Sequence, residues 1–400
     1  MLTATEALVI SSGLQGLAVT RALGERGVPV VVAHVRPDEL AARSRYAVRT
    51  CLVPPPERDG EAFVDALLSL AGEHAGAVLI PTTDEATRDV ARRAGDLARH
   101  YRLACPSYDA VARAVDKAYT YDLAMELGVP IPATFAPQSD AEIDEVAGRV
   151  DYPCLVKPRE SHLYVARFGA KVAVVANPRE LHEAHGAATA AGLKMLVQEL
   201  IPGPDQLGVN YNAFRARGAV HAECTARKVR LSPPRFGMPR VVLSDDVPEV
   251  VEPAHAILAA LDLEGFANLE FKRDPRDGTY MFFEVNCRHN HSSLLAVRCG
   301  LNFPYMTYRY ALCGELPPPA RATTGVYWIH EAAEIRQSAT RSGREGSPLR
   351  EIVRPWMHRK VLGVYDRNDP APIKDALRLA GHRAGGRWSA PGRLMRGLKP

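Results

Sequence analysis

The chain has 400 residues, of which 46% are hydrophobic and 24% charged, as expected for a folded globular protein of two or three domains. Its net charge of +4 is too small to indicate nucleic-acid binding, and no apolar stretch approaches the ~20 residues of a membrane span. Seven dispersed cysteines without a Cys-x-x-Cys pair, and no basic segment before an apolar run at the N-terminus, predict free thiols and a cytoplasmic protein.

The first hundred residues alternate between buried-type strands and helices. We expect strands over 7–10, 27–33 and 77–81, and helices over 11–26 and 63–74. A start of strand, helix and strand predicts a parallel sheet. The run Thr82-Thr83-Asp84-Glu85 resembles the N-cap of a further helix.

The loop over 11–16, Ser-Ser-Gly-Leu-Gln-Gly, is an incomplete dinucleotide-binding fingerprint. Its first glycine is missing, and His34 ends the next strand where an acidic residue would bind a ribose. We therefore favour a structural turn, or a contact to a small ligand, over NAD binding.

The middle of the chain has a different, α+β order of elements. We expect a helix over 109–127 closed by Gly128, and an extended link over 129–132. The strands expected after it lie over 152–158, 171–175, 195–201, 208–215 and 219–226, with helices over 181–191 and 248–261.

A β-hairpin over 268–288 is the most informative segment. Two alternating apolar runs flank the turn formers Asp274-Pro275-Arg276-Asp277-Gly278. If the hairpin is symmetric about Asp277, Glu270 lies opposite Glu284, about 4.5–5.5 Å away between Cβ atoms. Such carboxylates repel each other unless a cation lies between them.

Strand side chains alternate, so Asn286 and Arg288 share the face of Glu284, and Glu270 lies opposite on the other strand. Glu270, Glu284 and Asn286 form an oxygen-only ligand set that suits Mg²⁺ or Mn²⁺ rather than zinc. Arg288 suits a phosphate. The alternative is a solvated hairpin with charges on its wet face, but the apolar residues of both strands argue for burial.

Residues 110–315 resemble an ATP-grasp domain preceded by a pre-ATP-grasp α/β domain. Within that superfamily the chain resembles the carboxylate–amine ligases, a group that includes D-aspartate ligase-like enzymes. The resemblance rests on the order and spacing of Asp116-Lys117 with Leu127-Gly-Val-Pro130, Leu155-Val-Lys-Pro158, Val197-Gln-Glu-Leu-Ile-Pro-Gly203, Glu270 and Glu284-Val-Asn-Cys-Arg288.

The resemblance implies a fold and its boundaries. It implies a Rossmann-like α/β domain over 1–110, a two-lobed ATP-grasp domain over 111–320 with its small lobe over about 120–200, and a C-terminal extension over 321–400. In that extension we expect a strand over 326–330, a helix over 371–379, and a basic tail over 381–400 that is either a frayed terminus or a contact to a membrane surface or an anionic partner.

The resemblance also implies ATP as the nucleotide and a pair of Mg²⁺ (or Mn²⁺) ions. Expected ATP contacts are Lys117 and Lys157 on phosphates, Gln198, Glu199 and Ile201 at the adenine, and Asp205 on the ribose. A plain turn role for Asp205 is the alternative.

The remaining roles fall near the transferred phosphoryl group. Glu270, Glu284 and Asn286 match the metal ligands, and Arg288 matches a residue that stabilises the phosphoryl group or an oxyanion. Lys228 and Arg230 resemble a cationic loop at the γ-phosphate, with a solvated basic turn as the alternative. Substrate hydrogen bonds are assigned to His289 and Ser293, with loop packing or a zinc site at His289 and His291 as alternatives.

Two departures from the family pattern affect this assignment. The loop over 159–169 has one glycine, at its end, where the family has a glycine-rich phosphate loop, so Ser161, His162 or Arg167 would have to supply those contacts. Cys287 replaces a common proline, and we expect it to pack rather than to act as a nucleophile.

The expected function is ATP-dependent amide or peptide bond formation from a small-molecule carboxylate and an amine, through an acyl phosphate, with release of ADP and phosphate. No protein nucleophile is required. The alternatives are a catalytically weak ATP-binding regulatory protein and an ATP-grasp enzyme with a non-amine acceptor. A homodimer is also possible on this view, and no nucleic acid is expected.

Overall fold

The computed structural model describes residues 5–159, 164, 167–338 and 348–384. The predicted contacts at Ser161 and His162 and most of the basic tail lie outside the described residues. In the described part, no helix combines the length and the apolarity that crossing a membrane requires.

The chain forms a first unit, Met1–Ile131 with Ile201–Pro372, and a second unit, Pro132–Leu200 with Ile373–Pro400. The domain boundaries near 110 and 320 both fall inside the first unit and remain predictions.

The first unit begins with a five-stranded sheet in the order β3-β2-β1-β4-β5, in which all neighbours are parallel. Its strands are β1 (Ala7–Ser11), β2 (Val30–His34), β3 (Ala47–Leu52), β4 (Val78–Pro81) and β5 (Arg102–Leu103). Every residue of β1 and β4 is buried, as the continuous apolar runs of a covered parallel sheet require. The predicted parallel sheet is confirmed.

Six α-helices and one short 3₁₀ helix accompany this sheet. They are α1 (Gly13–Gly24), η1 (Ala41–Arg43), α2 (Gly60–His74), α3 (Asp84–Arg92), α4 (Ala94–Leu97), α5 (Tyr108–Val115) and α6 (Lys117–Glu126). The predicted cap of α3 is confirmed, because Thr83 accepts a hydrogen bond from the Ala86 backbone N–H. The prediction of one helix over 109–127 is wrong. Asp116 has extended backbone angles and its carboxylate caps Ala118 and Tyr119, so the helix ends and starts again there.

The glycine loop before α1 has a structural explanation. A Cβ at Gly16 would lie 1.9 Å from Ser11 Oγ, so glycine is required for the close approach of helix to strand. The buried carboxylate of Glu39 accepts a hydrogen bond from Ser11 Oγ at 3.3 Å, and burial raises the pKa of that carboxyl. A side chain of the chain itself therefore occupies this loop, which supports the structural-turn interpretation.

The rest of the first unit is built on a seven-stranded sheet in the order β14-β13-β10-β11-β12-β15-β16. Its strands are β10 (Gly208–Ala216), β11 (Ala219–Ser232), β12 (Met238–Asp245), β13 (Gly265–Arg273), β14 (Tyr280–Asn286), β15 (Tyr327–Ile329) and β16 (Lys360–Leu362). Neighbours are antiparallel except for the parallel pair β15 and β16. The expected strand near 326–330 is therefore confirmed.

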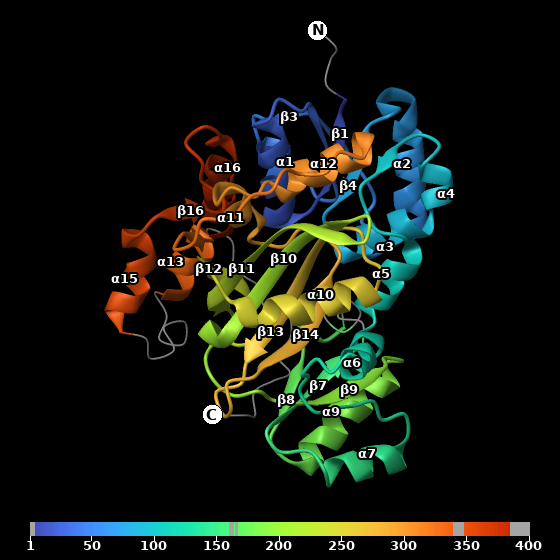
Figure 1. Ribbon diagram of the computed structural model, residues 1–400, viewed down its shortest axis with the longest axis vertical. Coiled ribbons are helices and arrows are strands. Elements are labelled where there is room, and N and C mark those ends of the chain that lie inside the picture. Colours follow the sequence, from blue (N-terminus) through green and yellow to red (C-terminus); the bar gives the residue numbers. More distant parts are fainter. Residues whose placement is uncertain (1–4, 160–163, 165–166, 339–347, 385–400) are drawn as a thin grey trace. The chain divides into compact units, whose positions relative to one another are not determined.

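Helices complete the first unit and join its two sheets. They are η2 (Asp205–Leu207), η3 (Pro248–Val250), α10 (Val251–Ala260), α11 (Ser293–Arg298), α12 (Phe303–Cys313), α13 (Glu331–Ser338), α15 (Leu349–Met357) and the start of α16 (Ala371–Ala384). Helix α12 packs against α1, β4 and β5 and also against β10 and β13 (Figure 1). Tyr308 on α12 donates a hydrogen bond to the Thr5 carbonyl at 2.6 Å. The N-terminal sheet is thus held against the sheet that carries the hairpin.

Among its described residues the second unit contains a four-stranded antiparallel sheet in the order β6-β9-β7-β8, accompanied by the helices α7 and α9. Its elements are β6 (Thr134–Phe135), α7 (Asp140–Ala147), β7 (Cys154–Pro158), β8 (Ala173–Val175), α9 (Pro178–Ala190) and β9 (Met195–Glu199). Its core includes Ile143 and Leu181 from the two helices and Val156 and Val197 from the central strands. The predicted strand that carries Lys157 is confirmed as the central strand β7.

Candidate active site

The hairpin of β13 and β14 has the predicted register. Glu270 pairs with Glu284, and Asn268 pairs with Asn286. A β-bulge follows Glu270 and shifts the rest of the ladder by one residue. The two carboxylates therefore lie opposite each other on adjacent strands, as expected.

A lysine from outside the hairpin pairs with each of these carboxylates. Lys117 Nζ lies 3.1 Å from Glu284 Oε1. Helix α6, which Lys117 begins, is held on β14 because Tyr121 donates a hydrogen bond to the Phe283 carbonyl at 2.8 Å. Asp116 caps the N-terminus of this helix and thereby fixes the position of Lys117 at its first residue.

The second lysine, Lys228 on β11, pairs with Glu270 across the intervening strand β10. Glycine at position 208 on β10 makes room for it, because a Cβ there would lie 3.1 Å from Lys228 Cδ. Sequence reasoning missed this role of Gly208, although the glycine opens a strand, where it usually marks a close approach.

Arg288 extends the cluster to the N-terminal sheet. Its Nη2 donates to Asn286 Oδ1 at 3.2 Å and to Asp84 Oδ2 at 2.8 Å. Burial alone would lower the pKa of this guanidinium, but the carboxylates of Asp84, Glu284 and Glu270 hold it above its usual value. Sequence reasoning recognised Asp84 only as part of a helix N-cap and did not connect it with Arg288.

The donor set of the hairpin fits a hard divalent cation. Two opposed carboxylates and the amide of Asn286, two residues after Glu284 on the same strand, supply only oxygen ligands. No group of three or more histidine, cysteine, aspartate or glutamate side chains suited to a metal occurs among the described residues. The chemistry of these oxygen donors therefore supports Mg²⁺ or Mn²⁺ rather than zinc.

The prediction of a loop or a solvated turn over 225–230 is wrong. The segment is part of β11 and pairs with β12. The guanidinium of Arg230 is buried and donates to Glu334 Oε1 at 2.9 and 2.6 Å. The buried Arg240 lies 3.3 Å from the other oxygen of Glu334. Of the expected pair, Lys228 therefore pairs with the hairpin carboxylate Glu270, whereas Arg230 pairs with Glu334.

Asp205 organises a turn of the first unit. Its two carboxylate oxygens accept hydrogen bonds from the backbone N–H groups of Leu231 at 2.8 Å and Arg235 at 2.9 Å. Nearby, Lys272 donates to the Ile201 carbonyl at 2.8 Å, and burial lowers the pKa of its ammonium. The turn role considered for Asp205 is present, and its ribose role remains a prediction.

In the second unit, the buried Lys157 on β7 donates to Gln198 Oε1 on β9 at 3.0 Å. Gln198 in turn donates to Thr134 Oγ1 at 2.7 Å, and Glu199 accepts a bond from the Ala133 backbone N–H at 3.2 Å. The structure therefore brings together two of the residues assigned to ATP, and it fixes the orientation of the Gln198 amide.

His289 lies behind Arg288 in an apolar environment. Its ring stacks on Phe266 with centroids 4.4 Å apart, and neither ring nitrogen has a hydrogen-bond partner. Burial, with a smaller effect of Arg288, lowers the pKa of this imidazole to about 3. Its assignment to a substrate remains a prediction, but the described contacts are those of packing.

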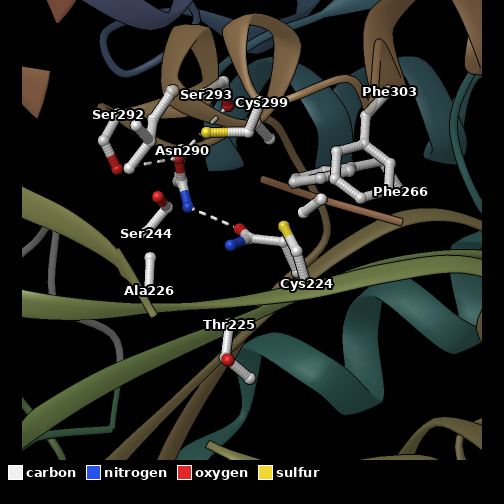
Figure 2. A pocket seen from close by; sticks show the side chains of 14 residues that line it. Cys224, Thr225, Ala226, Ser244, Phe266, Asn290, Ser292, Ser293, Cys299 and Phe303 are labelled. Atoms are coloured by element: carbon white, nitrogen blue, oxygen red, sulfur yellow. Dashed lines mark hydrogen bonds between the residues drawn. The ribbon is translucent and has the colours of Figure 1, made fainter. Parts of the chain in front are cut away.

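Ser293 lines a cavity of about 20 Å³, which is room for roughly one water molecule. Ser293 donates to Asn290 Oδ1 at 3.2 Å, and Asn290 donates to Asn212 Oδ1 at 2.7 Å. Figure 2 shows Asn290 at the centre of this network, with Ser244 and Cys299 nearby. These hydrogen bonds join the loop after Arg288 to strand β10.

Replacing His289 with leucine is expected to make the protein less sensitive to acid. The imidazole has a folded-state pKa of about 3, below the unfolded value of ~6.5, so the unfolded chain binds the proton preferentially. Its contribution to stability is present above about pH 6.5 and is lost as the pH falls toward 3. Urea midpoints at pH 7.5 and 5.0 should differ less for His289→Leu than for the wild type, and an equal difference would contradict the buried neutral state.

The cysteines behave as predicted. All seven are free thiols, and Cys287 is buried beside Arg288. Burial raises the pKa of the Cys287 thiol, so it remains protonated and packs rather than reacts.

Comparison with known proteins identifies the family to which the chain is similar. The family model described as "Carbamoyl-phosphate synthase L chain, ATP binding domain" matches residues 116–317, about half of the chain. The chain is 26% identical over 313 residues to a D-aspartate ligase from Enterococcus faecium (strain Aus0004), covering 74% of each sequence.

Two solved structures have a similar fold. The biotin carboxylase from Campylobacter jejuni, a complex with βγ-ATP by its description, has a TM-score of 0.65 and 19% identity, with 81% of this chain and 74% of that chain covered. The L-amino acid ligase from Bacillus licheniformis has a TM-score of 0.61 and 19% identity, with coverage of 80% and 78%.

Proposed function

The chain belongs to the family of the carbamoyl-phosphate synthase L chain ATP-binding domain, an ATP-grasp ligase family, and we propose that it joins a small-molecule carboxylate to an amine through an acyl phosphate. The observation that carries this proposal is the cross-strand pair Glu270 and Glu284, flanked by two lysines and followed by Asn286 and Arg288. An adenine-binding protein without phosphoryl transfer has no need of this set.

The reaction balances in two steps. A carboxylate oxygen of the donor attacks the γ-phosphorus of ATP, the bond to the bridging oxygen breaks, and ADP leaves. The neutral amine nitrogen then attacks the acyl carbon, the bond between that carbon and the phosphate oxygen breaks, phosphate leaves with the electron pair, and the nitrogen releases one proton to solvent. Such transfers depend on positioning and charge neutralisation rather than on a protein nucleophile.

We assign the hairpin carboxylates and Asn286 to the metal. A bound Mg²⁺ or Mn²⁺ would neutralise charge on the transferred phosphoryl group. Lys117 and Lys228, which pair with those carboxylates in the structure, would then be released to bind phosphate oxygens, and Arg288 would hold the phosphoryl group or the oxyanion of the second step. In the second unit, Lys157, Gln198 and Glu199 are assigned to the nucleotide.

The substrates we propose are amino acids or related small metabolites. The resemblance to a D-aspartate ligase and to an L-amino acid ligase supports this class. The test is ADP release with MgATP and pairs drawn from D-aspartate, other D-amino acids and L-amino acids, with product masses measured. A condensed product at the mass of acid plus amine minus water is expected. ATP turnover that no acid stimulates would contradict the proposal.

Replacing Lys157 with methionine is expected to raise the KM for ATP by about 10- to 100-fold, because a charge-assisted hydrogen bond contributes ~1.5–3 kcal/mol. The long apolar side chain of methionine keeps the packing of the buried stem. The matched control is Lys194→Met, which removes an exposed lysine of the same unit. Equal KM values for the two variants would contradict a role of Lys157 in nucleotide binding.

A further inference from the structure

Asp84 is an acid in the candidate active site that none of the roles above uses. It begins α3 in the N-terminal sheet region, 204 residues before Arg288, and its Oδ2 accepts the 2.8 Å hydrogen bond from that guanidinium. Its side chain is 40% exposed, whereas that of Arg288 is 20% exposed. Asp84 therefore presents a partly exposed carboxylate beside the arginine that we assign to the phosphoryl group or the oxyanion.

The charges around Arg288 set what Asp84 can bind. Glu270 and Glu284 are opposed by lysines and are assigned to a metal. In the described part of the structure, Asp84 forms its ion pair with Arg288 and none with a lysine. A positively charged amine that approaches the acyl carbon would meet repulsion from Arg288, Lys117 and Lys228, and Asp84 is the acid placed to offset it.

We infer that Asp84 binds the ammonium group of the amine acceptor and so selects for acceptors that carry one, such as amino acids. The bound nitrogen attacks the acyl carbon after it has released one proton to solvent. This inference rests on the proposed function, because it assumes an acyl phosphate held near Arg288. The rival explanation is that Asp84 only positions Arg288. The two differ in one respect: a binding residue affects the step that uses the acceptor, whereas a positioning residue affects both steps.

Hydroxylamine separates the two steps. It is uncharged at neutral pH, and its nitrogen attacks an acyl phosphate to give a hydroxamate and free phosphate. Hydroxamate formation thus reports acyl phosphate without an ammonium-bearing acceptor. The amide rate is measured with the acid and amine pair of highest ADP release, and the hydroxamate rate with the same acid.

For Asp84→Asn, the ratio of amide to hydroxamate formation at subsaturating acceptor is expected to fall by about 10- to 100-fold, the loss expected for one charge-assisted hydrogen bond, with the KM for the amine raised. Glu85→Gln is the matched control, since it removes the neighbouring carboxylate of the same helix turn, and its ratio should equal that of the wild type.

Two other outcomes would overturn the inference in distinguishable ways. If both rates of Asp84→Asn fell in proportion, Asp84 would act only by positioning Arg288. If the wild type itself produced no hydroxamate with any acid, the proposed acyl phosphate would be wrong, and the inference would fall with it.

Discussion

Replacing Glu284 with glutamine is expected to lower the rate of ADP formation by about 10²- to 10³-fold, the loss typical of removing one group that stabilises charge in a transition state. Glu284 is opposed to Glu270 across the hairpin and paired with Lys117. Glutamine keeps the shape of the side chain but removes the negative charge that a divalent cation requires. The measurement is steady-state ADP release with the best acid and amine pair.

The control for this variant is Asp277→Asn. It removes a carboxylate from the exposed turn of the same hairpin, where Asp277 Oδ1 accepts a hydrogen bond from the Thr279 backbone N–H at 2.9 Å. Asparagine retains that acceptor, so activity and the urea midpoint should stay at wild-type values. If Glu284→Gln kept at least half of the wild-type rate, the metal assignment would be wrong.

Replacing Asp369 with alanine is expected to destabilise the first unit by about 3–5 kcal/mol, the usual cost of leaving one partner of a buried ion pair behind. Asp369 Oδ2 lies 2.9 Å from Arg21 Nε, and both side chains are fully buried. The same carboxylate accepts hydrogen bonds from Ser44 Oγ and from the Arg45 backbone N–H, each at 2.8 Å. Alanine would leave Arg21 charged and without this partner inside α1.

Urea unfolding followed by circular dichroism measures this loss. The double variant Arg21→Met with Asp369→Leu is the control, because replacing both charges with apolar side chains removes the uncompensated charge. It should lose less stability than Asp369→Ala alone. A single variant within about 0.5 kcal/mol of the wild type, the range of ordinary surface substitutions, would show that the pair does not anchor the C-terminal segment.

Local signals made the hairpin predictable from sequence. The turn formers between Arg273 and Thr279 fix the loop, and the alternation of apolar residues fixes which side chains share a face, so the pairing of Glu270 with Glu284 followed directly. The bulge after Glu270 was not predictable, because no local pattern distinguishes it from a regular ladder. It leaves the pairing of Glu270 with Glu284 intact.

Contacts between distant segments could not be predicted. Asp84 and Arg288 meet because the N-terminal sheet region packs against the larger sheet, in part through α12, and nothing in the sequence around Asp84 indicates an arginine partner. The basic run ending at Arg230 suggested a solvated or phosphate-binding loop. Its burial depends on Glu334, which is 104 residues away in a segment without a recognisable motif.

Oxygen-18 transfer tests the central claim of an acyl-phosphate ligase most directly. The donor acid is labelled with oxygen-18 in its carboxylate and incubated with unlabelled MgATP and the amine. Because a donor carboxylate oxygen becomes the bridge to phosphorus and leaves with it, one labelled oxygen should appear in each phosphate released, as measured by mass spectrometry. Phosphate without label, formed alongside the amide, would contradict the mechanism proposed for this chain.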